Sequence, residues 1–453
     1  MRLFFQDQRF FSTLLKIAVP ITIQQFISSM TNMLDVLMIG QLGETSIAAL
    51  GLSNQIFFLL SILLFGISSG SAIFTAQYWG NKDLSNLKRV MGIGLSLGIG
   101  IAVIYTFIAL FVPEKILSFY TNDAAVIELG SQYLRIVGIS YIFTSITFTF
   151  VSVLRSTENV KLPMVITIIA LSLNMFLNYI LIFGNFGLPK MGVQGAALGT
   201  TIARILECIV IVFFAYKLKT PASARLSELR YSFSFLKKVL QTSLPAAVNE
   251  LFWSLGITTY NAVFAHIGTN AIAAVNINST IESMAFVIFI GIANACAIMI
   301  GNRIGAGDEE TAYDYANRFL ILAFVGAILI GIIVILIRPA VLSLYNIEPL
   351  SYKLAMQILL VFGAAMWIRV TNLMIFIGIL RAGGDTRFAL YVELGSIWLI
   401  GVPVALISAF VFHMPVYWVY IFIMAEEIVK LLFVYPRFKS KKWIHNLAET
   451  VKA

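Results

Sequence analysis

Three polar side chains inside long apolar stretches have types and spacing suited to holding a small cation. Asp35 is the only acid in its stretch, and Asn174 and Asn178 lie one helical turn apart on another. A carboxylate in a membrane helix costs about 2.5–3.5 kcal/mol on insertion scales, so one that persists usually faces a cavity. With amide oxygens beside it, it can replace water around sodium or hold a proton. We predict an ion-coupling site here; alternatively, the asparagines only join helices by hydrogen bonds.

A second set of polar residues lies in apolar stretches of the other half of the chain. It consists of Glu250, Glu393, Arg369 and Asn372. An ionisable side chain at such a position is a functional candidate by default, so we predict that this set binds substrate or a second cation. For Glu250, a structural ion pair with a partner such as Arg369 is an equal alternative. No opposite charge stands at helical spacing from Glu393, which keeps it a candidate.

Other charges in apolar stretches have partners close in sequence. Arg204 and Glu207 are three residues apart, and Lys430 follows Glu426 and Glu427 by four and three residues. Side chains at these spacings are neighbours on a helix surface. Local ion pairs near the membrane interface are therefore expected.

Familiar catalytic and metal motifs do not account for these residues. The three histidines are far apart, Cys208 and Cys296 lie in apolar stretches, and neither His-Glu-x-x-His nor G-x-x-x-x-G-K-[ST] occurs. The stretch from Gly66 to Gly70 fits the G-x-S-x-G pattern of hydrolases, but no strand precedes it and helix packing explains its small residues. We therefore predict that the chain is not an enzyme, with no catalytic residue, no structural metal and no cofactor.

The composition places the apolar stretches in a membrane. Residues of the types AVILMFWYC make up 59% of the 453, and charged residues only 12%. Soluble proteins are about 25% charged, and a water-facing globule of this size could not cover itself with so few charges. The net charge is +9, but the basic residues occupy short gaps between apolar runs. We predict contact with a lipid bilayer and no nucleic-acid partner.

Hydrophobic windows predict an all-α polytopic membrane protein with twelve transmembrane helices. The spans are expected near 14–39, 50–77, 90–112, 130–154, 162–184, 192–216, 240–266, 275–302, 316–337, 354–380, 388–411 and 416–436. Of the 31 Lys and Arg residues, 21 fall at the two ends and in alternate gaps, against four in the other gaps. Because Lys and Arg resist translocation, we predict a multi-pass protein of the cell membrane, inner or plasma, with both termini cytoplasmic.

The longest gap between spans divides the chain near its middle. Residues 217–239 are basic and partly amphipathic, which favours a linker along the cytoplasmic surface. We expect an N-terminal six-helix lobe at 1–216, a C-terminal six-helix lobe at 240–437 and a cytoplasmic tail at 438–453.

The two halves repeat each other in sequence. An offset of 225 residues aligns Pro20 with Pro245, and it also pairs turn glycines and loop aspartates. Further along, an offset of 226 aligns Leu154-Arg155 with Leu380-Arg381. Each half has an even number of spans, so the lobes should be related by a pseudo-two-fold axis along the membrane normal. Parallel repeats of this kind form transporters whose substrate site lies near the midplane.

Two segments resemble signatures of the multidrug and toxic compound extrusion (MATE) transporters. The first is DVLMIGQLG from Asp35 to Gly43, and the second is LNMFLNYILIFGNFGLPKMGVQGAALGT from Leu173 to Thr200. The resemblance covers nearly the whole chain. It implies two six-helix lobes, alternating access, and export of small organic, often cationic, compounds in exchange for protons or sodium. It is also consistent with a monomer.

The resemblance also bears on the candidate sites. It implies that Asp35, Asn174 and Asn178 form the N-lobe ion site, where Na⁺ could bind; proton-coupled relatives often have aspartate where this chain has Asn178. Sodium-coupled relatives have acids that align with Trp253 and Val370 here, so the second sodium site of those relatives is in question. Two alternatives remain, a lipid-linked precursor flippase of the same superfamily and an integral-membrane enzyme. The sequence leaves open the substrate and the choice between proton and sodium.

Overall fold

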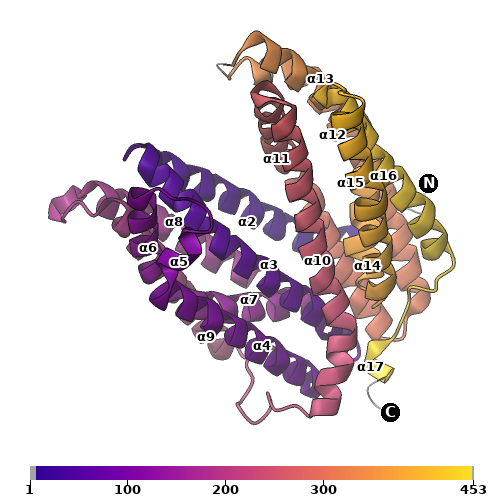
Figure 1. The fold of residues 1–453 in the computed structure, drawn as a ribbon. Helices are drawn as coiled ribbons and strands as arrows, with labels where there is room; N and C mark the ends of the chain where they lie inside the picture. The colour runs from indigo at the N-terminus through magenta and orange to yellow at the C-terminus, as the bar shows by residue number, and fades with distance from the viewer. Residues whose placement is uncertain (1–6, 346, 451–453) are drawn as a thin grey trace. The chain divides into compact units, whose positions relative to one another are not determined.

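The computed structural model describes residues 7–345 and 347–450, and every regular element in these ranges is helical (Figure 1). The first half contains α2 (Gln8–Gly40), α3 (Glu44–Gly80), α4 (Leu84–Phe111), α5 (Pro113–Leu117), α6 (Ala124–Val137), α7 (Ser140–Ser156), α8 (Lys161–Phe183), the 3₁₀ turn η1 (Asn185–Gly187) and α9 (Gly192–Lys217). The second half contains α10 (Phe233–Ile267), α11 (Thr269–Gly305), α12 (Glu309–Leu342), α13 (Pro349–Leu373), α14 (Thr386–Gly395), α15 (Val402–Leu406), α16 (Val416–Lys439) and α17 (Leu447–Thr450). Three π-helical segments complete it, η2 (Met374–Leu380), η3 (Ser396–Gly401) and η4 (Ile407–Val411).

These helices confirm the predicted all-α polytopic fold. In the described part of the chain, nine helices or helix series are long and apolar enough to cross a membrane, and α6 with α7, bent by 52°, forms a tenth. The remaining two predicted spans coincide with α10 and α16, which have 35 and 24 residues. Both carry acids that lower their mean hydropathy, Glu250 on α10 and Glu426 with Glu427 on α16.

The helices follow the sequence repeat closely. α3 and α11 have 37 residues each and start 225 positions apart. Each follows a glycine with positive φ, 108° at Gly43 and 151° at Gly268, a backbone region that favours glycine. α4 and α12 are both capped by aspartate: Asp83 accepts from an amide three residues later at 3.1 Å, and Asp308 does so at 3.2 Å.

The chain forms two compact units whose limits fall near the paired prolines. One unit holds residues 23–243, and the other holds the residues up to Thr22 together with those from Leu244 on. Pro20 lies inside α2 and Pro245 inside α10, where each removes a backbone hydrogen bond. The predicted lobes differ from these units at two places. Residues before 23 group with the second half of the chain, and residues 240–243 group with the first. The predicted lobe limits stay a prediction for the functional domains.

Close helix contacts shape the unit of residues 23–243, which we call the first unit; the other is the second unit. α8 runs beside α9, and α3 runs beside α4, which also packs on α7. Two glycines of α9 permit the approach of α8: a Cβ on Gly195 would lie 2.5 Å from the Leu181 carbonyl oxygen, and a Cβ on Gly199 would lie 2.4 Å from Asn178 Oδ1. In the second unit, α11, α12 and α13 pack on one another, and α13 also packs on α16.

Candidate polar cavity of the first unit

The structure brings the three predicted ion-coupling residues together. Asn178 on α8 donates from Nδ2 to Asp35 Oδ1 of α2 at 2.8 Å. Asn174 donates from Nδ2 to Asn178 Oδ1 at 3.5 Å and to Thr200 Oγ1 of α9 at 3.2 Å. We call these four residues the Asp35 group. Their contacts join α2, α8 and α9, so the proposed role of the asparagines as links between helices is compatible with a role in ion binding.

The amide of Asn178, which donates to Asp35, suits an ionised carboxylate there. A hydrogen bond to a charged group is about twice as strong as a neutral one. The arrangement also allows a cation, because turning the Asn178 amide over would present its oxygen beside the Asp35 oxygens. Asn178 is 1% exposed, so its amide needs these partners. Within residues 7–345 and 347–450, no cluster of three His, Cys, Asp or Glu side chains could hold a metal ion.

The Asp35 group lines a cavity of about 700 Å³, a volume typical of small-molecule sites. Its charged lining residues are Asp35, Arg204 and Glu207, which sum to one negative charge. Aromatic rings are present as well, from Phe57, Phe58, Tyr133 and Phe148. The remaining lining combines apolar side chains with amides and hydroxyls. Such a cavity can take a flat organic molecule with a positive charge.

The predicted local ion pair between Arg204 and Glu207 is confirmed at 3.3 Å. Both side chains line the same cavity as Asp35, and their expected place near the membrane interface stays a prediction. Glu207 is only 4% exposed. Sequence spacing identified its partner on the same helix, but it could not show which face of α9 is turned toward α2.

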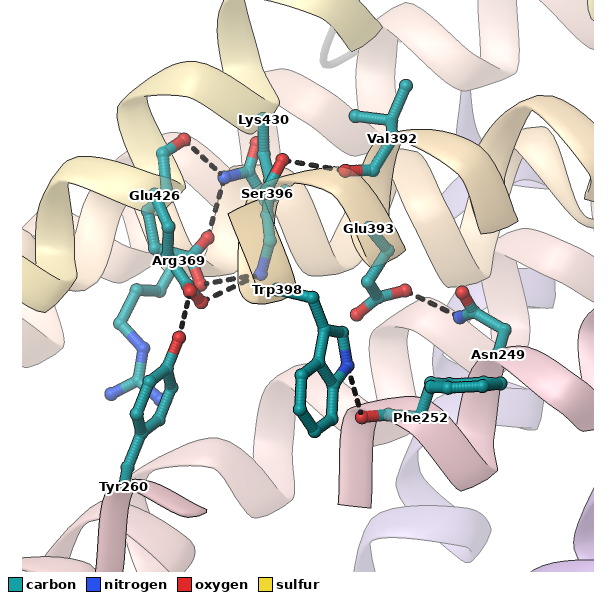
Figure 2. Close-up of polar contacts among 12 residues, drawn as sticks. Asn249, Phe252, Tyr260, Arg369, Val392, Glu393, Ser396, Trp398, Glu426 and Lys430 are labelled. Atoms are coloured by element: carbon teal, nitrogen blue, oxygen red, sulfur yellow. Dashed lines mark hydrogen bonds and ion pairs between the residues drawn. The ribbon is translucent and has the colours of Figure 1, made fainter. Parts of the chain in front are cut away.

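Of the second predicted set, two acids lie around one stretch of α10. Glu250 forms an ion pair with Arg381 at 2.5 Å. The structural ion pair considered for Glu250 is therefore present, but its partner is Arg381, directly after η2, and not Arg369. Glu393 on α14 accepts from Asn249 Nδ2 at 2.5 Å, as Figure 2 shows. The partner of Glu393 is thus a neutral amide on another helix, which helical spacing could not reveal.

The other two residues of this set, both on α13, have different partners. Arg369 pairs with Glu282 of α11 and lies over the rings of Phe286 and Phe362, 5.2 and 5.6 Å from their centres. Asn372 donates to Glu427 Oε2 of α16 at 2.7 Å. These contacts give Arg369 and Asn372 structural partners and leave their predicted binding role a prediction.

The predicted pairs on α16 are confirmed and belong to a larger cluster. Lys430 lies 3.1 Å from Glu426 and 3.3 Å from Glu427. Tyr260 of α10 donates to Glu426 (Figure 2). Glu282 was missed in the sequence, although it is the only acid in its predicted span and was open to the argument applied to Asp35.

Helical membrane proteins with ionisable groups facing an internal cavity and two parallel repeats include the membrane transporters. The comparisons with known proteins specify the family. The model of the MatE family matches residues 20–180 and 245–407, one match in each half of the chain. The chain therefore belongs to the MATE family, whose members are transporters and not enzymes.

Relatives and solved structures agree with this assignment. The chain is 26% identical to the probable multidrug resistance protein NorM of Thermotoga maritima, over 95% of this chain and 92% of that protein. It is 25% identical to the uncharacterised transporter YisQ of Bacillus subtilis, over 96% and 95%. A crystal structure of MATE in the straight conformation superposes with a TM-score of 0.85 at 22% identity, covering 95% of this chain and 96% of that one. The last match supports the fold.

Proposed function

We propose that this protein is a secondary active antiporter that exports small organic, often cationic, compounds in exchange for protons or sodium. The observation that carries the proposal is the half-buried carboxylate of Asp35, which accepts a hydrogen bond from Asn178 at 2.8 Å in a cavity of about 700 Å³. It is supported by similarity to proteins named as probable multidrug resistance proteins. The protein needs no cofactor beyond the coupling ion.

The charge of the cavity favours a cationic substrate. With Asp35 and Glu207 ionised, Arg204 leaves one negative charge uncompensated. A bound organic cation would neutralise it, and the aromatic rings of the lining would contact its flat face. The same balance disfavours a lipid-linked anionic precursor, because an anion would add to the negative charge.

Coupling follows from competition for one carboxylate. A proton or a sodium ion on Asp35 cancels the charge that attracts the substrate, so ion and substrate bind better apart than together. If the cavity opens alternately to the two sides of the membrane, inward ion flow then drives substrate outward. We further propose that the protein acts as a monomer in the cell membrane with both termini in the cytoplasm.

The test uses purified protein in liposomes with a fluorescent organic cation. An imposed proton gradient or sodium gradient should drive dye across the membrane, and Asp35→Asn should abolish the transport while leaving a folded, monodisperse protein. Parallel runs in sodium-free buffer at several pH values separate the two ions. Gradient-driven transport that survives unchanged in Asp35→Asn would refute the assigned role. Movement of a labelled lipid precursor without dye transport would favour the flippase alternative.

A further inference from the structure

A continuous series of hydrogen bonds leads away from the cavity inside the first unit. Arg155, near the end of α7, donates to Gln24 Oε1 of α2 at 2.6 Å. Gln24 donates from Nε2 to Thr167 Oγ1 of α8 at 2.9 Å, and Thr167 donates to Glu207 Oε1 of α9 at 2.8 Å. We call this series the Arg155 chain. Each of four helices contributes one residue, so the chain connects the end of α7 with the cavity wall.

The Arg155 chain lies further along the helices than the Asp35 group. Thr167 precedes Asn178 by eleven residues on α8, about 16 Å at the helical rise of 1.5 Å per residue. Glu207 follows Thr200 by seven residues on α9, about 10 Å by the same rise. Both displacements run toward the helix ends that the distribution of Lys and Arg places on the cytoplasmic side.

The direction of the hydrogen bonds stabilises an ionised Glu207. Every donor in the chain points toward its carboxylate, and the first donor is a charged arginine. Polar groups linked in this way polarise one another, which strengthens each bond. On its other oxygen, Glu207 pairs with Arg204. A carboxylate that is 4% exposed needs such compensation, because burial otherwise disfavours its charge.

The same contacts can accommodate a proton on Glu207. A threonine hydroxyl has one hydrogen and two acceptor positions. Thr167 could accept from protonated Glu207 and from Gln24 together, with its own hydrogen turned to the carbonyl one turn earlier, as threonines in helices commonly do. Protonation would also remove the charge that holds Arg204, whose side chain lines the same cavity as Asp35.

We propose that Glu207 is a second proton-binding site of this cavity and that Arg204 couples its occupancy to Asp35. A proton arriving at Glu207 frees Arg204 to pair with the Asp35 carboxylate, and loss of that proton draws Arg204 back. This inference rests on the proposed antiport function, and it gives the chain a second titratable acid although residue 178 is asparagine. The charged and titratable groups around Glu207 are Arg204 and Cys208 on α9, Asp35 on α2, Tyr133 on α6 and, through Gln24, Arg155 on α7.

Transport measurements test the coupling. In liposomes, Glu207→Gln fixes the neutral form, so proton-driven dye transport should fall by about tenfold or more and lose most of its pH dependence. Dye binding without a gradient should also weaken, because the substitution removes the uncompensated negative charge of the cavity. Glu44→Gln is the matched control, since Glu44 is an exposed acid in the first turn of α3, and it should behave as wild type. Unchanged rate and pH profile in Glu207→Gln would overturn the inference.

An infrared titration of the purified protein tests proton binding itself. The carbonyl band of a protonated carboxyl group should lose one component in Glu207→Gln and another in Asp35→Asn. Thr167→Val keeps Glu207 but removes the hydroxyl that contacts its carboxylate, so the Glu207 component should change in frequency while the Asp35 component stays in place. If the carbonyl band of the protonated carboxyl group disappears entirely in Asp35→Asn, Glu207 binds no proton and the inference is overturned. This result decides the question even if Glu207→Gln does not fold. Failure of the wild type to exchange dye for ions would refute the antiport function instead.

Discussion

Replacement of Gly199 by alanine is expected to disable the Asp35 group without removing any of its polar atoms. The new Cβ would lie 2.4 Å from Asn178 Oδ1, whereas ordinary contacts begin at 3.4 Å. The Asn178 side chain must therefore move by about 1 Å, which stretches its 2.8 Å bond to Asp35 beyond the range of a hydrogen bond.

The size of the effect follows from the bond that is lost. A hydrogen bond to a charged group contributes about 1.5–3 kcal/mol, which corresponds to roughly 10- to 150-fold in an equilibrium. The Asn178 amide stabilises the ionised form of Asp35. Gly199→Ala should therefore shift the proton or sodium concentration that gives half-maximal dye transport by that factor. The assay is the initial transport rate as a function of proton or sodium concentration, measured in liposomes with equal amounts of protein.

A matched substitution separates this effect from a general change in helix packing. Gly100 on α4 has nothing within 4 Å of an added Cβ, so Gly100→Ala should transport as wild type. It should also be slightly more stable, because alanine favours a helix by about 1 kcal/mol over glycine. A Gly199→Ala protein with wild-type ion dependence would refute the reasoning that ties Asn178 to the function of Asp35.

Three further substitutions test contacts outside the cavity. Glu250→Gln removes one ion pair of the buried Arg381 and should lower the free energy of unfolding by up to about 3–5 kcal/mol, with recovery in the double variant that also replaces Arg381 by glutamine; thermal unfolding in detergent measures both. Asp83→Ala removes an N-cap and should cost about 1 kcal/mol in the same assay, and a cost near zero would show that the cap is dispensable. Glu228 in the linker accepts from Lys88 at 2.9 Å, and this bond lowers its pKa; the pair therefore stabilises the linker at neutral pH and loses that effect on acidification through the pKa. Protease cleavage of the linker should accordingly be faster in Glu228→Gln than in wild type at neutral pH, and the difference should vanish in acid.

The sequence singled out three of the four residues of the Asp35 group, all but Thr200, because membrane helices rarely tolerate acids and strongly polar side chains. Asp35 and the two asparagines stood out in apolar stretches, and helical spacing placed Asn174 and Asn178 on one face. Periodicity within one helix cannot, however, show which helices lie side by side. The Arg155 chain is a clear case, since its four residues come from four helices. Only Arg155 and Glu207 among them are charged near neutral pH.

The second set of residues shows the same limit from the other side. Helical spacing found the partners of Lys430, which lie on its own helix, and it missed the partner of Glu250, which is 131 positions away in the chain. Arg369, the example suggested as a partner of Glu250, lies in another predicted span of the same half. The structure shows that its partner is Glu282, on a helix that the sequence argument had not connected with it.

The π-helical segments of the second half bear on how the two halves came to differ. The offset between the halves is 225 up to Asp308 and 226 at Leu380, so one residue was added or lost in between. η2 ends at Leu380. A π turn accommodates one extra residue per turn, so the helix after it keeps its orientation. An added residue in an uninterrupted α-helix would rotate everything after it by about 100°. A π turn such as η2 can take up such a residue locally and keep Arg381 directed toward α10, so a change of length in one half is compatible with the ion pair to Glu250.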